Sequence, residues 1–240
     1  MNLCSNLLYS ISRLCRLLLF TILAGCTGSN GQLTVVEQHP DLEYELTGIP
    51  LLFFGFGTST PITPELSLTV AHVAKLNYDK VIAYHPQCDL AIVESRNTLN
   101  HQPKFGLVYP NQSVETFGMS PGGSVLKGEG IYRLDLTLID SHYFDKCPAS
   151  IMDAPVQDGM SGGGVYNQEG ALVGIIAARA IPSNIQLVNG QSHGLDRISI
   201  FVALNFARDW LDSEIEKYYG EHYVAMEWQE PSDTLLVKGN

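Results

Sequence analysis

Apolar residues occur along this chain in short runs, and turn-forming residues separate one run from the next. Pro61 and Pro64 mark one turn, Pro121-Gly122-Gly123 a second and Gln168-Glu169-Gly170 a third. Many short strands at this spacing favour an antiparallel sandwich or barrel over alternating β–α units. The predicted strands are Leu33–Glu37, Leu51–Thr58, Leu66–Ala71, Lys80–Tyr84, Leu90–Glu94, Val114–Gly118, Gly130–Ile139, Gly163–Tyr166, Ala171–Ala178, Gln186–Val188 and Arg197–Ala203.

One later segment has a helical period instead. Between Phe206 and Tyr219 the apolar residues recur at positions that share one broad face of a helix. Asn205 is a suitable N-cap, and Gly220 is a suitable residue to end the helix. The pattern therefore predicts an all-β domain closed by one helix over 205–220, while residues 221–240 carry no clear signal.

The N-terminal region has the layout of an export signal. Arg13 and Arg16 precede an apolar run from Leu17 to Leu23, and no acidic residue occurs before Glu37. The run is too short to cross a hydrocarbon layer of roughly 30 Å. It ends in Leu23-Ala24-Gly25-Cys26, which resembles a bacterial lipobox. An ordinary signal peptide with a coincidental cysteine is the alternative.

The lipobox resemblance implies a signal peptide over 1–25 and lipidation of Cys26, which becomes the mature N-terminus. Residues 26–32 then form a short flexible tether that keeps the folded domain near the bilayer. Thr27 after the cysteine would suit sorting to the outer membrane. The expected location is thus the bacterial cell envelope, lipid-anchored on the periplasmic face.

Composition and charge narrow the choice of partner. The 240-residue chain has 14 basic and 25 acidic residues, a net charge of −11, and loss of residues 1–25 makes this −13. Such an acidic balance argues against nucleic acid, whose phosphates are bound by Lys and Arg. No CxxC pair suggests zinc. Cys88 and Cys147 are the remaining cysteines, and in an oxidising compartment they form either a disulfide or two separate buried thiols.

Three short motifs carry the candidate chemistry. The first is Leu68-Thr69-Val70-Ala71-His72, which places an imidazole at the end of a strand. The second is Asp89-Leu90-Ala91-Ile92, in which an acid opens an apolar strand and can face an imidazole. Each is weak alone, because a single His or Asp beside a strand is usually a surface or turn residue.

The third motif is stronger. It runs Asp158-Gly159-Met160-Ser161-Gly162-Gly163-Gly164, where glycines allow a sharp turn and close approach of a carbonyl group. The N–H groups of Gly159 and Ser161 can point at one oxygen atom and form an oxyanion hole. A glycine-rich hairpin loop without catalytic meaning is the alternative.

Together, in this order, the three motifs resemble those of the chymotrypsin/trypsin-like serine peptidases. The likeness is closest to the bacterial HtrA-like and glutamyl-endopeptidase-like branches, and Gly55-Phe56-Gly57-Thr58 fits the same family. It covers residues 50–211 and implies two antiparallel six-stranded barrels with a C-terminal helix. The implied peptidase domain spans 33–220, with one barrel over about 33–110 and the other over about 111–204.

The resemblance also implies roles for individual residues. Ser161 is the nucleophile, His72 the general base and acid, and Asp89 the carboxylate that orients His72, in a serine endopeptidase that acts through an acyl-enzyme. Protein or peptide substrates are expected, with no cofactor and no metal. Only 16 residues separate His72 from Asp89, so Asp79 remains an alternative orienting acid and a hairpin of the first barrel is expected to be shortened. The segment before Gly48 could supply the missing strand.

Substrate preference is expected to depend on two segments. Pro155 stands where trypsin-like pockets place an acid, and Ile176, Ala177, Ala178 and Arg179 form the strand that would pair with a peptide. A small or medium apolar residue before the cleaved bond is the expectation. Met160 replaces the acid of the self-activating enzymes. A catalytically inactive trypsin-fold lipoprotein that binds or scaffolds is the alternative function, and the oligomeric state is left open.

Overall fold

The computed structural model describes residues 28–49, 52–97, 99, 103–139, 141 and 143–229. The predicted signal peptide and the lipidation site Cys26 lie outside these residues, as does most of the C-terminal tail. No helix in the described part of the chain is long and apolar enough to cross a membrane.

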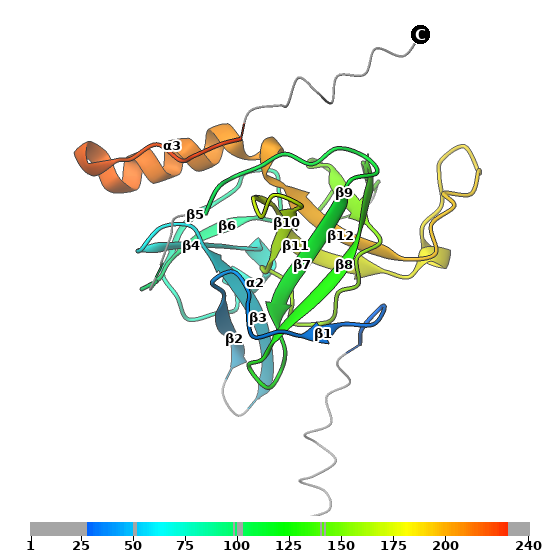
Figure 1. Cartoon of the computed structure of the whole chain (residues 1–240), viewed down its shortest axis with the longest axis horizontal. Coiled ribbons are helices and arrows are strands. Elements are labelled where there is room, and N and C mark those ends of the chain that lie inside the picture. The colour runs from blue at the N-terminus through cyan, green and yellow to red at the C-terminus, as the bar shows by residue number, and fades with distance from the viewer. Residues whose placement is uncertain are drawn as a thin grey trace, which may run out of the picture.

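The chain is mostly β-structure (Figure 1). Its strands are β1 (Thr34–Val35), β2 (Glu43–Ile49), β3 (Phe53–Pro61), β4 (Leu66–Thr69), β5 (Val81–Tyr84), β6 (Ala91–Glu94), β7 (Ser113–Met119), β8 (Val125–Leu136), β9 (Ala149–Met152), β10 (Gly164–Asn167), β11 (Leu172–Ala180) and β12 (Ile198–Ala203). The α-helices are α2 (Ala71–Ala74) and α3 (Arg208–Tyr219), with short 3₁₀ turns at Pro182–Asn184, Leu204–Phe206 and Gly220–His222.

The second half of the chain forms a closed antiparallel barrel of six strands. Their order is β8-β7-β10-β11-β12-β9, and pairing of β8 with β9 closes the ring. β1 adds to the free side of β8, with Thr34 opposite Lys127. The long β8 can join three neighbours because a register shift between Tyr132 and Leu134 bends it.

The described residues of the first half form an antiparallel sheet of five strands in the order β2-β3-β4-β6-β5, one fewer than the six expected. β2 was not among the strands predicted from the apolar pattern, because two of its inward positions are polar, Glu45 and Thr47, both buried. It overlaps the segment before Gly48 that was considered as a source of the missing strand. The connection between β4 and β6 holds only α2 and the short β5. This is the shortened hairpin that the His72-to-Asp89 spacing predicts.

Among the described residues, one predicted strand is not formed, and one strand that was not predicted is present. Gln186–Val188 is irregular, and Val188 is 88% exposed, so this apolar stretch has no sheet to join. Conversely, Ala149–Met152 forms a fully buried strand that is too short to show a clear alternation.

The helix α3 follows the barrel of the second half but packs on the sheet of the first. It begins at Arg208, after a 3₁₀ turn at Leu204–Phe206, so Asn205 is not its N-cap. Gly220, with φ +55°, ends it as expected. Tyr218 donates to Glu94 on β6, and Leu211 and Ile215 are buried. The two halves share one large apolar core, which includes Leu68 and Ile92 from the sheet and Ile175 and Val202 from the barrel.

The predicted flexible tether at 26–32 is wrong for the part that the structure describes. Gly28–Gly31 lies against residues 156–158 and β12 through backbone and side-chain hydrogen bonds. A Gly/Ser/Asn composition indicates flexibility only when nothing nearby pairs with the backbone, and here the barrel supplies partners.

Candidate active site

His72 and Asp89 contact each other directly. The buried strand β4 ends at Thr69, and the single helical turn of α2 then presents His72, whose side chain is 31% exposed. The His72 Nδ1 atom lies 2.7 Å from Asp89 Oδ2, and the His72 backbone N–H donates to Asp89 Oδ1 at 3.0 Å. A carboxylate only accepts hydrogen bonds, so Nδ1 carries the hydrogen. Nε2 is then free to accept a proton.

The turn that carries Asp89 is held from several sides. Asp89 is 3% exposed and lies between β5 and β6. Its neighbour Cys88 forms a disulfide with Cys147 of the barrel half. His85 Nδ1 accepts from the Cys88 N–H at 2.8 Å and from the Gln87 N–H at 3.1 Å. His85, which lies close to Asp89 in sequence, therefore shapes the turn and makes no contact of its own with the His72 ring.

The alternative acid Asp79 lies elsewhere. Its Oδ2 accepts from Asn77 Nδ2 at 3.1 Å, and it interacts with the buried Glu45. Desolvation, followed by Asp79, raises the pKa of Glu45 to about 7. Of the two carboxylates considered, the structure brings Asp89 and not Asp79 to His72.

Ser161 lies in a tight loop between β9 and β10 that the first sheet holds in place. The Thr58 N–H donates to the Ser161 carbonyl at 2.8 Å, and Thr58 Oγ1 donates to the Gly159 carbonyl at 2.9 Å. Thr60 Oγ1 donates to the Gly162 carbonyl at 3.0 Å. β3 thus donates hydrogen bonds to three backbone carbonyls of the serine loop.

Two glycines are required in this loop. Gly159 and Gly162 have φ +96° and +92°, a region that side-chain-bearing residues rarely adopt. A Cβ at Gly159 would lie 1.9 Å from the Phe56 ring, and one at Gly162 would lie 1.7 Å from the Thr58 carbonyl. Within the described residues, neither the Gly159 N–H nor the Ser161 N–H has an acceptor, so both remain available for a ligand oxygen.

The Ser161 hydroxyl has a partner on the neighbouring strand. Its Oγ donates to the Ala177 carbonyl of β11 at 3.1 Å. No hydrogen bond joins Ser161 to His72 among the described residues. Hydrogen bonds between a nucleophile and its base are often long in structures without substrate.

A cleft of about 610 Å³ brings these groups together. It is lined by His72, Asp89, Tyr143, Phe144, Val156, Gln157, Asp158, Ser161, Ile176, Ala177, Ala178, Arg179, Ala180, Ile181 and Asn184. Four of the five predicted substrate-contact residues therefore reach the cleft, namely Ile176, Ala177, Ala178 and Arg179. Pro155 does not: it is buried behind the wall, and its carbonyl accepts from Thr116 Oγ1 at 3.1 Å.

Tyr143 was missed by the sequence analysis. Its ring lies 5.6 Å from the His72 ring, at the end of the segment that the Cys88–Cys147 disulfide draws toward the first sheet. No local motif marks it, because it follows β8 by several residues in irregular backbone.

An ion pair crosses one wall of the cleft. Arg179 Nε lies 2.9 Å from Asp158 Oδ1, and Arg179 Nη2 donates to Asp158 Oδ2 at 3.0 Å. Arg179 lowers the pKa of Asp158, and Asp158 in turn raises the pKa of Arg179. The sequence analysis singled out Arg179 but not its partner's role.

Comparison with known proteins gives a fold and little sequence similarity. No family model matches the chain, and no curated protein matches it. The MamO protease domain from Magnetospirillum magneticum is 19% identical with a TM-score of 0.53, over 71% of this chain and 95% of that one. The active form of the Rv3671c protease from M. tuberculosis is 18% identical with a TM-score of 0.55, over 72% and 79%.

A third similar structure is the HtrA-type protease AlgW with a tripeptide. It is 18% identical with a TM-score of 0.58, over 75% of this chain and 61% of AlgW. At these identities the likeness concerns the fold. The chain adopts a trypsin-like serine-protease fold, with one six-stranded barrel, a five-stranded sheet and a C-terminal helix.

Proposed function

We propose that this protein is a serine endopeptidase that cleaves peptide bonds through Ser161, His72 and Asp89. The observation that carries the proposal is that His72, paired with buried Asp89 at 2.7 Å, lines the same cleft as Ser161. Three motifs that are far apart in sequence thus converge on one cleft, which chance resemblance does not explain.

The positions of these groups support the following reaction. Ser161 Oγ attacks the substrate carbonyl carbon, and its proton passes to His72 Nε2. Asp89 accepts from Nδ1 and stabilises the imidazolium. The N–H groups of Gly159 and Ser161 bind the oxyanion, a contribution typically worth ~2.7–4 kcal/mol per donor. His72 then protonates the leaving amine, and water hydrolyses the acyl-enzyme through the same base.

The cleft supports a small or medium apolar side chain next to the cleaved bond. Ile176, Ala177 and Val156 give its walls an apolar lining, and the charge of Arg179 is already paired with Asp158. On the side that faces β10, the pairing of β11 ends at Ile175, so the backbone groups near Ala178 on that side can pair with an extended peptide.

A fluorophosphonate probe tests the enzymatic claim. It phosphonylates an activated serine: a bond forms between Oγ and phosphorus, fluoride leaves, and the serine proton passes to the base. We expect labelling of the wild type and none of Ser161→Ala or His72→Ala, while the exposed controls Ser183→Ala and His39→Ala label normally. A folded wild type that does not react would overturn the proposal.

The bond between Ser161 Oγ and the Ala177 carbonyl favours one alternative, a non-enzymatic binding module with this fold. A hydroxyl that donates to a carbonyl is not donating to His72. This alternative predicts a protein that binds extended peptides but does not react with the probe.

We also propose that Cys26 anchors the protein in the bacterial cell envelope through a lipid. The support is the lipobox-like sequence Leu23-Ala24-Gly25-Cys26 after a basic and apolar region. Cys26→Ala is expected to move the protein from the membrane fraction to the soluble fraction, and Cys4→Ala is the matched control. Unchanged fractionation of Cys26→Ala would count against the anchor.

A further inference from the structure

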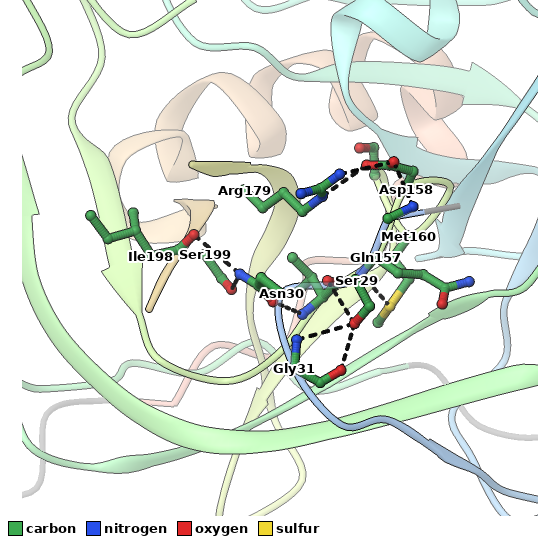
Figure 2. A network of polar contacts seen from close by, with 12 residues as sticks. Ser29, Asn30, Gly31, Gln157, Asp158, Met160, Arg179, Ile198 and Ser199 are labelled. Atoms are coloured by element: carbon green, nitrogen blue, oxygen red, sulfur yellow. Dashed lines mark hydrogen bonds and ion pairs between the residues drawn. The ribbon is translucent and has the colours of Figure 1, made fainter. Parts of the chain in front are cut away.

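The residues Gly28–Gly31, here called the N-terminal strap, pair with the segment 156–158 that leads into the serine loop (Figure 2). The Asn30 N–H donates to the Val156 carbonyl at 3.1 Å, and the Asp158 N–H donates to the Gly28 carbonyl at 3.0 Å. Ser29 and Gln157 form an antiparallel bridge between them. The strap is therefore paired with this segment through one isolated β-bridge and the two backbone hydrogen bonds beside it.

The Asn30 side chain extends this pairing to a second element. Its Oδ1 accepts from the Val156 N–H at 2.8 Å, and its Nδ2 donates to Ser199 Oγ on β12 at 2.9 Å (Figure 2). Arg197 Nε also donates to the Asn30 carbonyl at 2.8 Å. One amide side chain thus links the segment 156–158 to the barrel strand behind it.

The opposite side of the same segment faces the cleft. Val156, Gln157 and Asp158 all line it, and Asp158 directly precedes the oxyanion donor Gly159. Val156 is only 2% exposed. Without the Asn30 side chain, the Val156 N–H would lose its acceptor in a buried place, which is unfavourable. The segment 156–158 would then shift so that the Val156 N–H can bond to another acceptor.

Gly28 contacts the ion pair between Asp158 and Arg179 at the cleft. Its N–H donates to Asp158 Oδ2 at 3.0 Å, beside the contacts from Arg179. A Cβ at Gly28 would lie 2.3 Å from Arg179 Nη2. A methyl group there would displace the end of the Arg179 side chain and leave the Asn30 contacts in place.

We propose that the N-terminal strap positions the cleft wall 156–158 for substrate, so that Asn30 and Gly28 are positioning residues for peptide binding. The inference rests on the proposed function of the cleft. Gly28 lies two residues after Cys26 in the sequence. The segment that would connect the folded domain to the lipid is therefore the same segment that supports the cleft wall 156–158.

Steady-state kinetics of the full chain test the strap. The substrates are extended peptides, and Asn30→Ala and Gly28→Ala are compared with Gln32→Ala, an exposed neighbour in the same segment. For Asn30→Ala we expect KM to rise about fivefold to tenfold, which is the size of effect that losing one to two hydrogen bonds would have. The kcat value and the reaction rate with a small fluorophosphonate, which does not occupy the wall, should change less than about twofold.

Hydrogen exchange and melting temperature complete the test. Asn30→Ala should speed exchange of the Val156 and Asp158 amides, and Gln32→Ala should not. A variant that melts lower but keeps the wild-type KM would show a purely structural strap and overturn the inference. If Asn30→Ala folds poorly, the KM of Gly28→Ala tests the same inference. A wild type that does not react with the fluorophosphonate would instead overturn the proposed function.

Discussion

The Thr58 N–H donates to the carbonyl of Ser161 at 2.8 Å and thereby ties strand β3 of the first sheet to the serine loop of the barrel. Thr58 Oγ1 also donates to the Gly159 carbonyl and accepts from the Met119 N–H, each at 2.9 Å. The candidate nucleophile and oxyanion donors are thus positioned by a residue about 100 positions earlier in the chain.

Replacing Thr58 by Val tests this relationship. Val has a similar shape but cannot bond Gly159 or Met119, so we expect the free energy of unfolding to fall by about 1–3 kcal/mol. Because the Gly159 carbonyl is released, the rate of fluorophosphonate labelling should fall about tenfold. Denaturant unfolding and labelling kinetics measure the two effects. Thr34→Val, exposed on β1, is the control, and an unchanged labelling rate would limit Thr58 to a role in folding.

Replacing Asp89 by Asn tests the orienting carboxylate. Asn presents either an amide NH₂ that cannot accept from Nδ1 or a weaker acceptor, so His72 can adopt the wrong tautomer. Labelling should fall on the order of 10⁴-fold, as for such substitutions in triads of this type. Asp79→Asn is the matched control and should label like the wild type. Equal loss in both variants would show that the local fold, and not the pair with His72, is affected.

Removing the disulfide tests how the two halves are joined at the site. Cys88 and Cys147 are 59 positions apart, and closing a loop of that size typically stabilises a protein by about 2–4 kcal/mol. Cys88→Ala with Cys147→Ala should therefore lower the melting temperature. The labelling rate should also fall, because Asp89 and Tyr143 flank the bridge. A reductant should reproduce both changes in the wild type, and no change in melting would argue against a formed bond.

The buried carboxyl group of Glu45 makes stability depend on pH. Burial, then Asp79, raises its pKa from 4.5 in the unfolded chain to about 7. Below pH 4.5 the group is protonated in both states. Between 4.5 and 7 only the unfolded chain has lost the proton, so stability falls as the pH rises through this window.

Glu45→Gln should remove most of this pH dependence. The amide stays neutral and can still donate to Asp79, so the melting temperature above pH 7 should rise by several degrees. The exposed Glu37→Gln is the control. A wild-type melting temperature that is flat between pH 4.5 and 7.5 would contradict the raised pKa. Burial also raises the pKa of nearby Glu43, so a shallow slope of the same sign is expected to remain in Glu45→Gln.

The part of the candidate site that could be predicted is the serine loop, because its backbone conformation depends on residues within one short motif. The sequence Gly159-Met160-Ser161-Gly162 needs glycines at positive φ, and its composition alone indicates a tight loop with free N–H groups. Positions that depend on partners distant in sequence were not predictable. Pro155 was expected in the cleft but lies behind its wall, because Thr116 on β7 binds its carbonyl.

The strands of the fold likewise differ in whether they could be predicted from the local sequence. Apolar strands such as Ala91–Glu94 and Ile198–Ala203 were visible because strands that are buried on both faces read as nearly continuous apolar runs. Glu43–Ile49 was not, because its buried Glu45 and Thr47 follow from side-chain partners and not from hydrophobicity.

By itself, the sequence determined the all-β architecture, the closing helix and the three motifs, since periodicity and glycine placement act over a few residues. Tertiary structure decided which acid meets His72, which residues reach the cleft, and that Gly28–Gly31 is bound and not a free tether. Those outcomes depend on hydrogen bonds between separate segments of the chain, from the pair His72 and Asp89, 17 positions apart, to the pair Val156 and Asn30, 126 positions apart. No local pattern encodes such a distance, because the barrel brings the two segments together only once it has closed.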